Sequence, residues 1–158
     1  PRLRRVDGVA RIDDTLTLFS DVTGADCVPQ GNRTLCERAD GQYFPDRFLH
    51  EQSLLVREGD KTVLFTGCAH RGVVNICARA GELLGRAPDA VVGGMHLFSP
   101  STGKSEPDEA IRAVAARLAH TSSRYYTGHC TGAHAFEVLR ETFGERISLL
   151  AAGSVIEL

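Results

Sequence analysis

The chain has 158 residues, 42% of them hydrophobic and 24% charged, which is enough for one domain with a buried core. A formal net charge of −2 argues against nucleic acid as a partner, and no apolar run reaches the about 20 residues of a membrane-spanning helix. The five cysteines include no Cys-x-x-Cys pair, and an odd number does not fit a secreted disulfide framework. We therefore expect a single cytoplasmic domain over residues 1–158, with no nucleic-acid or membrane partner.

The first third of the chain predicts one strand followed by a long loop. Leu16–Ser20 is a short apolar run typical of a strand. Residues 21–49 lack sustained periodicity and are rich in Asp, Gly, Pro and Asn. Because a loop of that length inside a compact domain usually has a function, we expect it to form a lid or a pocket wall.

Two β-branched runs, Ser53–Glu58 and Thr62–Thr66, then predict a hairpin around the turn Gly59-Asp60. A helical pattern follows and is closed by Gly85. Its apolar positions recur with a period near 3.6 residues, at Val73, Val74, Cys77, Ala80, Leu83 and Leu84.

The second half of the chain alternates short strands with helices. Ala90–Val92 and Arg124–Thr127 are predicted strands. The helix after the first strand begins with a capping-box-like pattern at Ser105, and the helix after the second ends at Gly144. We expect two closing strands, Ile147–Leu150 and Ser154–Ile156. This order predicts an α/β layered domain.

The histidines follow the predicted strands in a regular way. His70, His96 and His129 each come after a glycine at a strand end, and His50 stands just before the strand that begins at Ser53. A single histidine in a loop is more often a surface residue, but three in equivalent positions favour a shared metal site. Strand ends meet at one edge of a sheet, where imidazoles from neighbouring strands can converge on an ion.

Four motifs carry a resemblance to a known family: Phe48–Leu54, Phe65–Ile76, Gly93–Leu97 and Gly128–Gly132. In this order they resemble the C-terminal half of a branch of the metallo-β-lactamase superfamily. That branch is similar to the dihydropterin–ribofuranosylaminobenzene phosphate synthase of archaea. The resemblance covers about residues 44–158, and residues 1–43 match only loosely.

This resemblance implies half of an αββα metallo-β-lactamase sandwich, a mixed sheet with helices packed on one face. The superfamily's His-x-His-x-Asp-His motif belongs to the first half and is absent here, and the chain begins with Pro1. The resemblance therefore implies a fragment whose partner is a missing N-terminal half carrying that motif. Alternatively, a second copy of the chain would form a homodimer and cover the sheet face that the N-terminal half would otherwise cover.

The resemblance also implies roles for individual residues. His50 falls at a downstream histidine ligand position, where some relatives are expected to carry an acid, and His129 falls at the last histidine ligand. Cys68 and His70 lie around a position that is a bridging Asp in many relatives, with His70 favoured as the ligand and Cys68 as the alternative.

Two further residues are candidates for catalysis, Glu51 and His96. Glu51 is a candidate to hold a ligand in place, as is Asn75, which is equally well explained as a helix-face residue. His96 resembles a pocket residue more than a metal ligand.

The implied function is a metal-dependent hydrolase or related transferase with one or two divalent ions, zinc or else manganese or iron. Its substrate would be a small anionic molecule that bears phosphate or carboxylate. A pterin-like molecule is the more specific expectation. Neutral imidazoles leave the charge of the ion uncompensated, so we expect this chain alone to bind metal poorly, if at all, and to be inactive.

Two alternatives stay open at this point. One is a non-catalytic binding or oligomerisation module that keeps the fold. The other is a cysteine-dependent enzyme using Cys68 or Cys130 with a neighbouring histidine. A strand would point the sequence neighbours His129 and Cys130 apart, which weighs against that version.

Overall fold

The computed structural model describes residue 3 and residues 5–158. A seven-stranded mixed sheet runs in the order β1-β2-β5-β6-β7-β10-β11, antiparallel from β1 to β6 and parallel from β6 to β11. Its strands are β1 (Val9–Arg11), β2 (Leu16–Phe19), β5 (Ser53–Glu58), β6 (Lys61–Phe65), β7 (Ala90–Gly93), β10 (Arg124–Thr127) and β11 (Ile147–Leu149). The α/β class and the mixed sheet are as expected.

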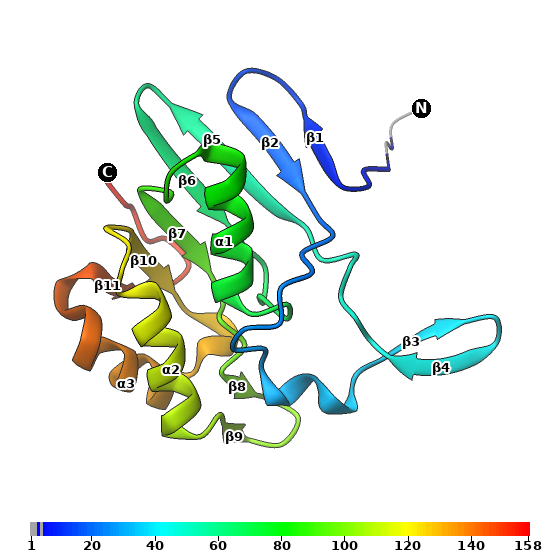
Figure 1. Cartoon of the computed structure of the whole chain (residues 1–158). Coiled ribbons are helices and arrows are strands. Elements are labelled where there is room, and N and C mark those ends of the chain that lie inside the picture. Colours follow the sequence, from blue (N-terminus) through cyan, green and yellow to red (C-terminus); the bar gives the residue numbers. More distant parts are fainter. Residues whose placement is uncertain (1–2, 4) are drawn as a thin grey trace.

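Three helices lie on one face of the sheet (Figure 1): α1 (Val73–Leu84), α2 (Asp108–Leu118) and α3 (Ala133–Phe143). Each connects two parallel strands, as βαβ units require. Between the layers lies one hydrophobic core, to which the strands contribute Leu55, Leu64, Val91 and Tyr125 and the helices Ile76, Ile111 and Leu139. The expectation of helices packed on one face is confirmed.

The opposite face of the sheet carries a second apolar row. Cross-strand pairing places Leu18, Leu54, Phe65, Val92 and Tyr126 side by side across five strands. None of the three helices covers this row, and Phe65 is 41% exposed. Successive residues of a strand point to opposite faces of the sheet. The residues of this row therefore lie on the face opposite the buried core residues.

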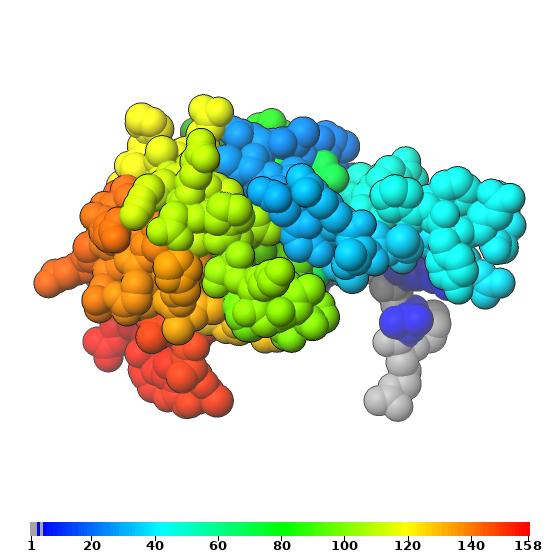
Figure 2. Space-filling model, turned by 90° about the horizontal axis from the view of Figure 1, so that it is seen from below, coloured from blue at the N-terminus to red at the C-terminus, as the bar shows by residue number. Residues whose placement is uncertain are grey.

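Two small hairpins extend from the main sheet. They are β3 (Cys36–Ala39) with β4 (Gln42–Pro45), and β8 (Phe98–Ser99) with β9 (Lys104–Ser105). The β3–β4 hairpin stands away from the body of the molecule (Figure 2). The predicted long loop 21–49 therefore contains a 3-10 turn, Gln30–Thr34, and a hairpin that the sequence did not reveal.

Two local predictions are wrong. Ser154–Ile156 forms no strand, because the Ser154 amide donates to the Ala151 carbonyl and the Ser154 hydroxyl accepts from the Ala151 amide, which makes a turn. Ser105 does not cap the following helix. The N-cap residue of α2 is Pro107, without a side-chain cap, and Asp108 and Glu109 supply negative charge to the first turn instead.

Within the described residues, no helix has the length and apolarity needed to cross a membrane.

Candidate metal centre

Three parallel strands, β6, β7 and β10, end at one edge of the sheet and open into glycine-containing loops. A cavity of about 500 Å³ lies there. Its lining comes from all three loops and from the segment after β11: Thr66, Gly67, Cys68, Gly93, Gly94, Gly128, His129, Leu150, Ala151 and Ala152. Active sites of layered α/β domains gather at such an edge.

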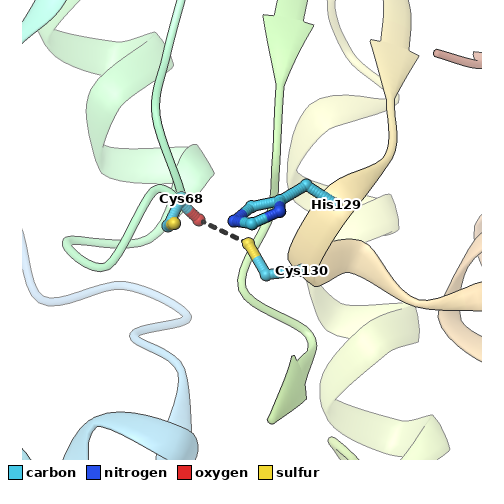
Figure 3. Close-up of side chains that lie close together, drawn as sticks. All are labelled: Cys68, His129 and Cys130. Carbon is cyan, nitrogen blue, oxygen red and sulfur yellow. Dashed lines mark hydrogen bonds between the residues drawn. The ribbon is translucent and has the colours of Figure 1, made fainter. Parts of the chain in front are cut away.

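Three ligand-type side chains converge at this edge (Figure 3). The ligand atoms of Cys68, His129 and Cys130 all lie within 4.8 Å of one another. Cys68 follows β6, whereas His129 and Cys130 follow β10, and β7 lies between these two strands in the sheet. Two sulfurs and one imidazole nitrogen form a donor set that zinc accepts readily.

The convergence of His129 with Cys130 corrects the sequence-based argument that these neighbours point apart. Residues His129–Thr131 form a 3-10 turn, and His129 has a positive φ of 51°. This left-handed backbone turns the two side chains toward the same side, which an extended strand would not do.

Surrounding backbone fixes the position of the Cys130 sulfur. A Cβ added at Gly94 would lie 2.6 Å from Cys130 Sγ, so only glycine leaves room for the thiol. The thiol donates to the Cys68 carbonyl at 3.5 Å. The Met95 amide donates to Thr131 Oγ1 at 3.0 Å, which ties the 3-10 turn to the loop after β7.

Burial, together with the neighbouring Cys68, raises the pKa of the Cys130 thiol to about 12. A thiol with such a pKa is protonated near neutral pH and is a poor nucleophile, because the thiolate is the reactive form. This argues against the alternative interpretation of a cysteine-dependent enzyme that uses Cys130. A bound divalent ion deprotonates a coordinating thiol, so the same residue fits a ligand role.

Three further histidines, His50, His70 and His96, lie in a row together with Phe48. The His70 ring stacks on Phe48 with 4.5 Å between centroids, and the His96 ring lies 4.0 Å from that of His70. The His50 ring lies 6.0 Å from that of Phe48, and its Nδ1 is 3.8 Å from Asp46 Oδ1.

Among the described residues, the only group of three or more close ligand atoms is the one formed by Cys68, His129 and Cys130. The structure therefore brings His129 and Cys68 together and places His50 and His70 beside Phe48 instead. A ligand set of His50, His70 and His129 stays a prediction.

Asn32 determines which nitrogen of His70 carries the proton. Its side-chain amide donates to the His70 carbonyl at 2.6 Å, which leaves Asn32 Oδ1 facing His70 Nδ1 at 2.9 Å. An oxygen acceptor requires a proton on Nδ1, so the lone pair of the neutral ring is on Nε2. No sequence pattern predicts this role, because Asn32 lies 38 residues from His70 in the long loop.

His96 is buried, and its Nδ1 has no hydrogen-bond partner in the described structure. Desolvation lowers the pKa of both His96 and His70, and each ring's nearness to another histidine lowers it further. Both rings are therefore neutral near neutral pH. A buried nitrogen without a hydrogen-bond partner is uncommon in folded proteins.

Glu51 holds the loop that carries His70. Its Oε1 accepts from the His70 amide at 2.8 Å and its Oε2 from the Arg71 amide at 2.9 Å. Both oxygens therefore have backbone partners. The contacts give Glu51 a positioning role, while its role in catalysis stays a prediction.

Asn75 and Arg71 bind the long loop to the start of α1. Asn75 accepts from the Asp26 amide at 3.0 Å and donates to the Asp26 carbonyl at 2.7 Å. The Arg71 guanidinium donates to the carbonyls of Val22 and Gly24, both at 2.6 Å. Asn75 thus has a structural role in the wall of the site, and the part played by Arg71 was not predicted.

Comparison with known proteins supports the sequence resemblance. No family model matches the chain. It is 26% identical over 118 residues to the 7,8-dihydropterin-6-methyl-4-(beta-D-ribofuranosyl)-aminobenzene-5′-phosphate synthase of Methanocaldococcus jannaschii, covering 74% of this chain and 38% of that protein. Among solved structures it resembles Tm1679, a metal-dependent hydrolase of the beta-lactamase superfamily, with a TM-score of 0.81 and 27% identity.

The match to Tm1679 covers 98% of this chain and 57% of that protein. The chain thus spans well under two thirds of either relative. The resemblance inferred from four motifs is confirmed, since its structural relatives are members of the metallo-β-lactamase superfamily.

Proposed function

We propose that this relative of the metallo-β-lactamase superfamily is the C-terminal part of a metal-dependent hydrolase or related transferase. The observation that carries the proposal is the convergence of Cys68, His129 and Cys130 at the edge where three parallel strands end. They border a cavity of about 500 Å³, which is a suitable size for a small-molecule substrate.

The proposed cofactor is zinc, or manganese or iron, with one or two ions in a complete site. The ligand set predicted from the sequence is His129 with His50 and His70, with Cys68 as the alternative to His70, and the observed convergence favours the version with Cys68. Such an ion supplies an activated water and polarises a carbonyl or phosphoryl oxygen. The chain itself contributes ligand orientation through Asn32.

The proposed substrate is a small anion bearing phosphate or carboxylate, and a pterin-like molecule is the more specific version. The name of the archaeal relative contains both a dihydropterin and a phosphate. His96 stays the candidate pocket residue, since its ring lies 4.0 Å from that of His70.

The proposed partner is an N-terminal half carrying a His-x-His-x-Asp-His motif, in a cytoplasmic protein. Two observations support it: the uncovered apolar row on the sheet, and the part of Tm1679 that this chain does not match. A homodimer is the alternative. Because half of the ligands would be missing, we propose that the isolated chain has no turnover.

The test uses the protein in which this chain is joined to such an N-terminal half. Metal content would be measured by inductively coupled plasma mass spectrometry, and hydrolysis with phosphate-ester and lactone probes. His129→Ala should remove metal and activity together, whereas the exposed His120→Ala should change neither. Turnover that survives His129→Ala would contradict the proposal, and metal-free, inactive full-length protein would favour a binding module instead.

A further inference from the structure

We propose that Cys130 is itself a metal ligand, and that Cys68, His129 and Cys130 form a two-thiolate, one-imidazole site selective for a thiophilic divalent ion. The inference rests on the proposed metal-dependent function and names a ligand and a selectivity that the sequence did not suggest. The three ligand atoms lie within 4.8 Å of one another (Figure 3).

A cysteine in or against the core is most often a small apolar residue, and the half-buried Cys77 on α1 is an example of that kind. Cys130 differs in its surroundings. It is 3% exposed, yet its sulfur faces the carbonyl of Cys68 rather than an apolar neighbour. This contact holds the thiol in place in the metal-free chain, and its proton would be released when the sulfur binds an ion.

The local backbone departs from common conformations where it delivers this sulfur. His129 adopts a positive φ, which is uncommon for a residue other than glycine. Gly94 leaves the space that the sulfur occupies, since a Cβ there would approach it to 2.6 Å. Two independent features, one in the 3-10 turn after β10 and one in the loop after β7, thus place Cys130 opposite Cys68.

The charge of the proposed set suits a divalent ion. Two thiolates neutralise a 2+ charge, whereas a set of imidazoles alone leaves it uncompensated. Binding would form three metal–ligand bonds and release the proton of each thiol that becomes a thiolate. We therefore infer that this chain binds one thiophilic ion by itself, which revises the expectation that it binds metal poorly.

The donor types predict which ions bind. Thiolate and imidazole ligands suit zinc, cobalt and ferrous iron, whereas magnesium, calcium and manganese prefer oxygen ligands. Cys68 and His129 line the cavity that Gly67 and Gly128 also border, so an ion held by them would be within reach of a small molecule in that cavity.

The experiment is an anaerobic titration of the 158-residue chain with Co²⁺, followed by absorption spectroscopy. Thiolate-to-cobalt charge-transfer bands should appear in the near ultraviolet. Their intensity should fall to about half in Cys130→Ser and in Cys68→Ser, since one of the two thiolates of the proposed set is lost. The matched control Cys77→Ser should keep the full intensity. Full intensity in Cys130→Ser would overturn the proposal.

Competition with a chelator measures the affinity. Zinc should bind at least about tenfold more weakly to Cys130→Ser than to the unaltered chain. Removing a group that only hydrogen-bonds to a metal ligand can already cause a loss of about tenfold. Mn²⁺ should compete poorly. Mn²⁺ binding as tight as that of Zn²⁺ would refute the selectivity.

Cadmium-113 NMR of the unaltered chain provides a readout that needs no variant to fold. A strongly downfield resonance would indicate two sulfur ligands, and a shift typical of one sulfur or none would overturn the proposal. The two proposals fail differently. A two-thiolate ion in a protein without hydrolytic activity would refute the hydrolase, whereas hydrolysis with an unaltered Cys130→Ser spectrum would refute this ligand assignment.

Discussion

His129 occupies the left-handed region of backbone space, and Ala69 and His96 do so in the two neighbouring loops. Each such residue costs about 1–3 kcal/mol unless its surroundings compensate, and such residues cluster at ligand sites. All three flank the cavity or the row of histidines beside it. Three of the seven described non-glycine residues with a positive φ therefore lie at the edge that the ligand atoms mark.

Gly94→Ala tests the packing around the Cys130 sulfur. The new methyl group would meet Sγ at 2.6 Å, so the thiol must move and metal affinity should fall. Gly81→Ala on α1 is the matched control, because its Cβ would have 3.8 Å of clearance and alanine favours a helix by up to about 1 kcal/mol. Isothermal titration with Zn²⁺ and thermal unfolding measure the two effects, and equal zinc affinity in Gly94→Ala would contradict the packing argument.

The buried histidines predict how stability depends on pH in the metal-free chain. Burial lowers the pKa of His70 and of His96 below the ordinary 6.5, so the unfolded chain binds more protons between those values. Stability should be fully present above pH 6.5 and should be lost as the pH falls through 6.5 toward the lowered values.

Urea unfolding at a series of pH values measures this slope. The double replacement His70→Gln with His96→Gln should flatten it, and the exposed control His120→Gln should not. An unchanged slope in the double variant would assign the acid sensitivity to other groups.

Sequence reasoning placed the right residue types at this edge but not the contacts among them. The strand-end pattern identified His129, which follows the end of β10, whereas Cys68 entered only through the family resemblance, as the alternative to His70. The nearness of Cys130 depends on one left-handed φ at His129, which no local pattern specifies for a non-glycine residue. The partner of His70 is Asn32, and that contact depends on the path of a long loop.

At the scale of elements, the segment that follows β2 is held across the start of α1. Arg71 and Asn75 bind backbone groups of residues 22–26, and the Gly31 amide donates to Glu106 Oε1 at 2.9 Å. These contacts place Asn32 and Gly31 against the histidines of the site. The segment is therefore a fixed wall in this structure.

Arg71→Lys should loosen that wall. A lysine carries one ammonium group and cannot reproduce the guanidinium fork, whose Nε and Nη2 donate to the carbonyls of Val22 and Gly24 and whose Nη1 donates to that of Arg47. We expect faster hydrogen exchange and proteolysis in residues 22–34, with a loss of about 1–3 kcal/mol in unfolding free energy. Arg79→Lys is the control, because Arg79 pairs only with Glu82 on the surface of α1. Unchanged hydrogen exchange in Arg71→Lys would argue against a role of Arg71 in holding residues 22–34 in place.

The elements that the sequence predicted are those with a regular apolar pattern. The strands β5, β6, β7 and β10 and the helix α1 were placed within a residue, since alternation, period 3.6 and terminal glycines are local signals. The β3–β4 hairpin was missed although Asp40-Gly41 is a turn signal, because nearly all of its strand residues are exposed and no apolar alternation flanks the turn.

At the scale of the whole molecule, the sheet has two apolar faces but only one helical layer. The row from Leu18 to Tyr126 is contiguous across five strands and lies on the face that the helices leave uncovered, so we propose it as an association face. We expect the isolated chain to self-associate at micromolar concentration.

The double variant Leu54→Ala with Phe65→Ala tests this face, because the two residues are cross-strand partners on it. Analytical ultracentrifugation should show less self-association, with little change in stability. The pair Leu55→Ala with Leu64→Ala is the control from the same strands, since both side chains are buried under the helices and each loss should cost about 2–5 kcal/mol. Equal association in the Leu54 and Phe65 variant would place the contact elsewhere.

The two sulfurs at the sheet edge are 62 residues apart in the chain, with α1, β7 and α2 between them. Any ion that bridges them would act as a reversible cross-link, closing a long loop and reducing the freedom of the unfolded chain. Such an ion would bind the native state far better than the unfolded one, so the melting temperature would rise with the free concentration of the ion. Availability of the metal in the cell would then govern how long the polypeptide survives as well as whether it works.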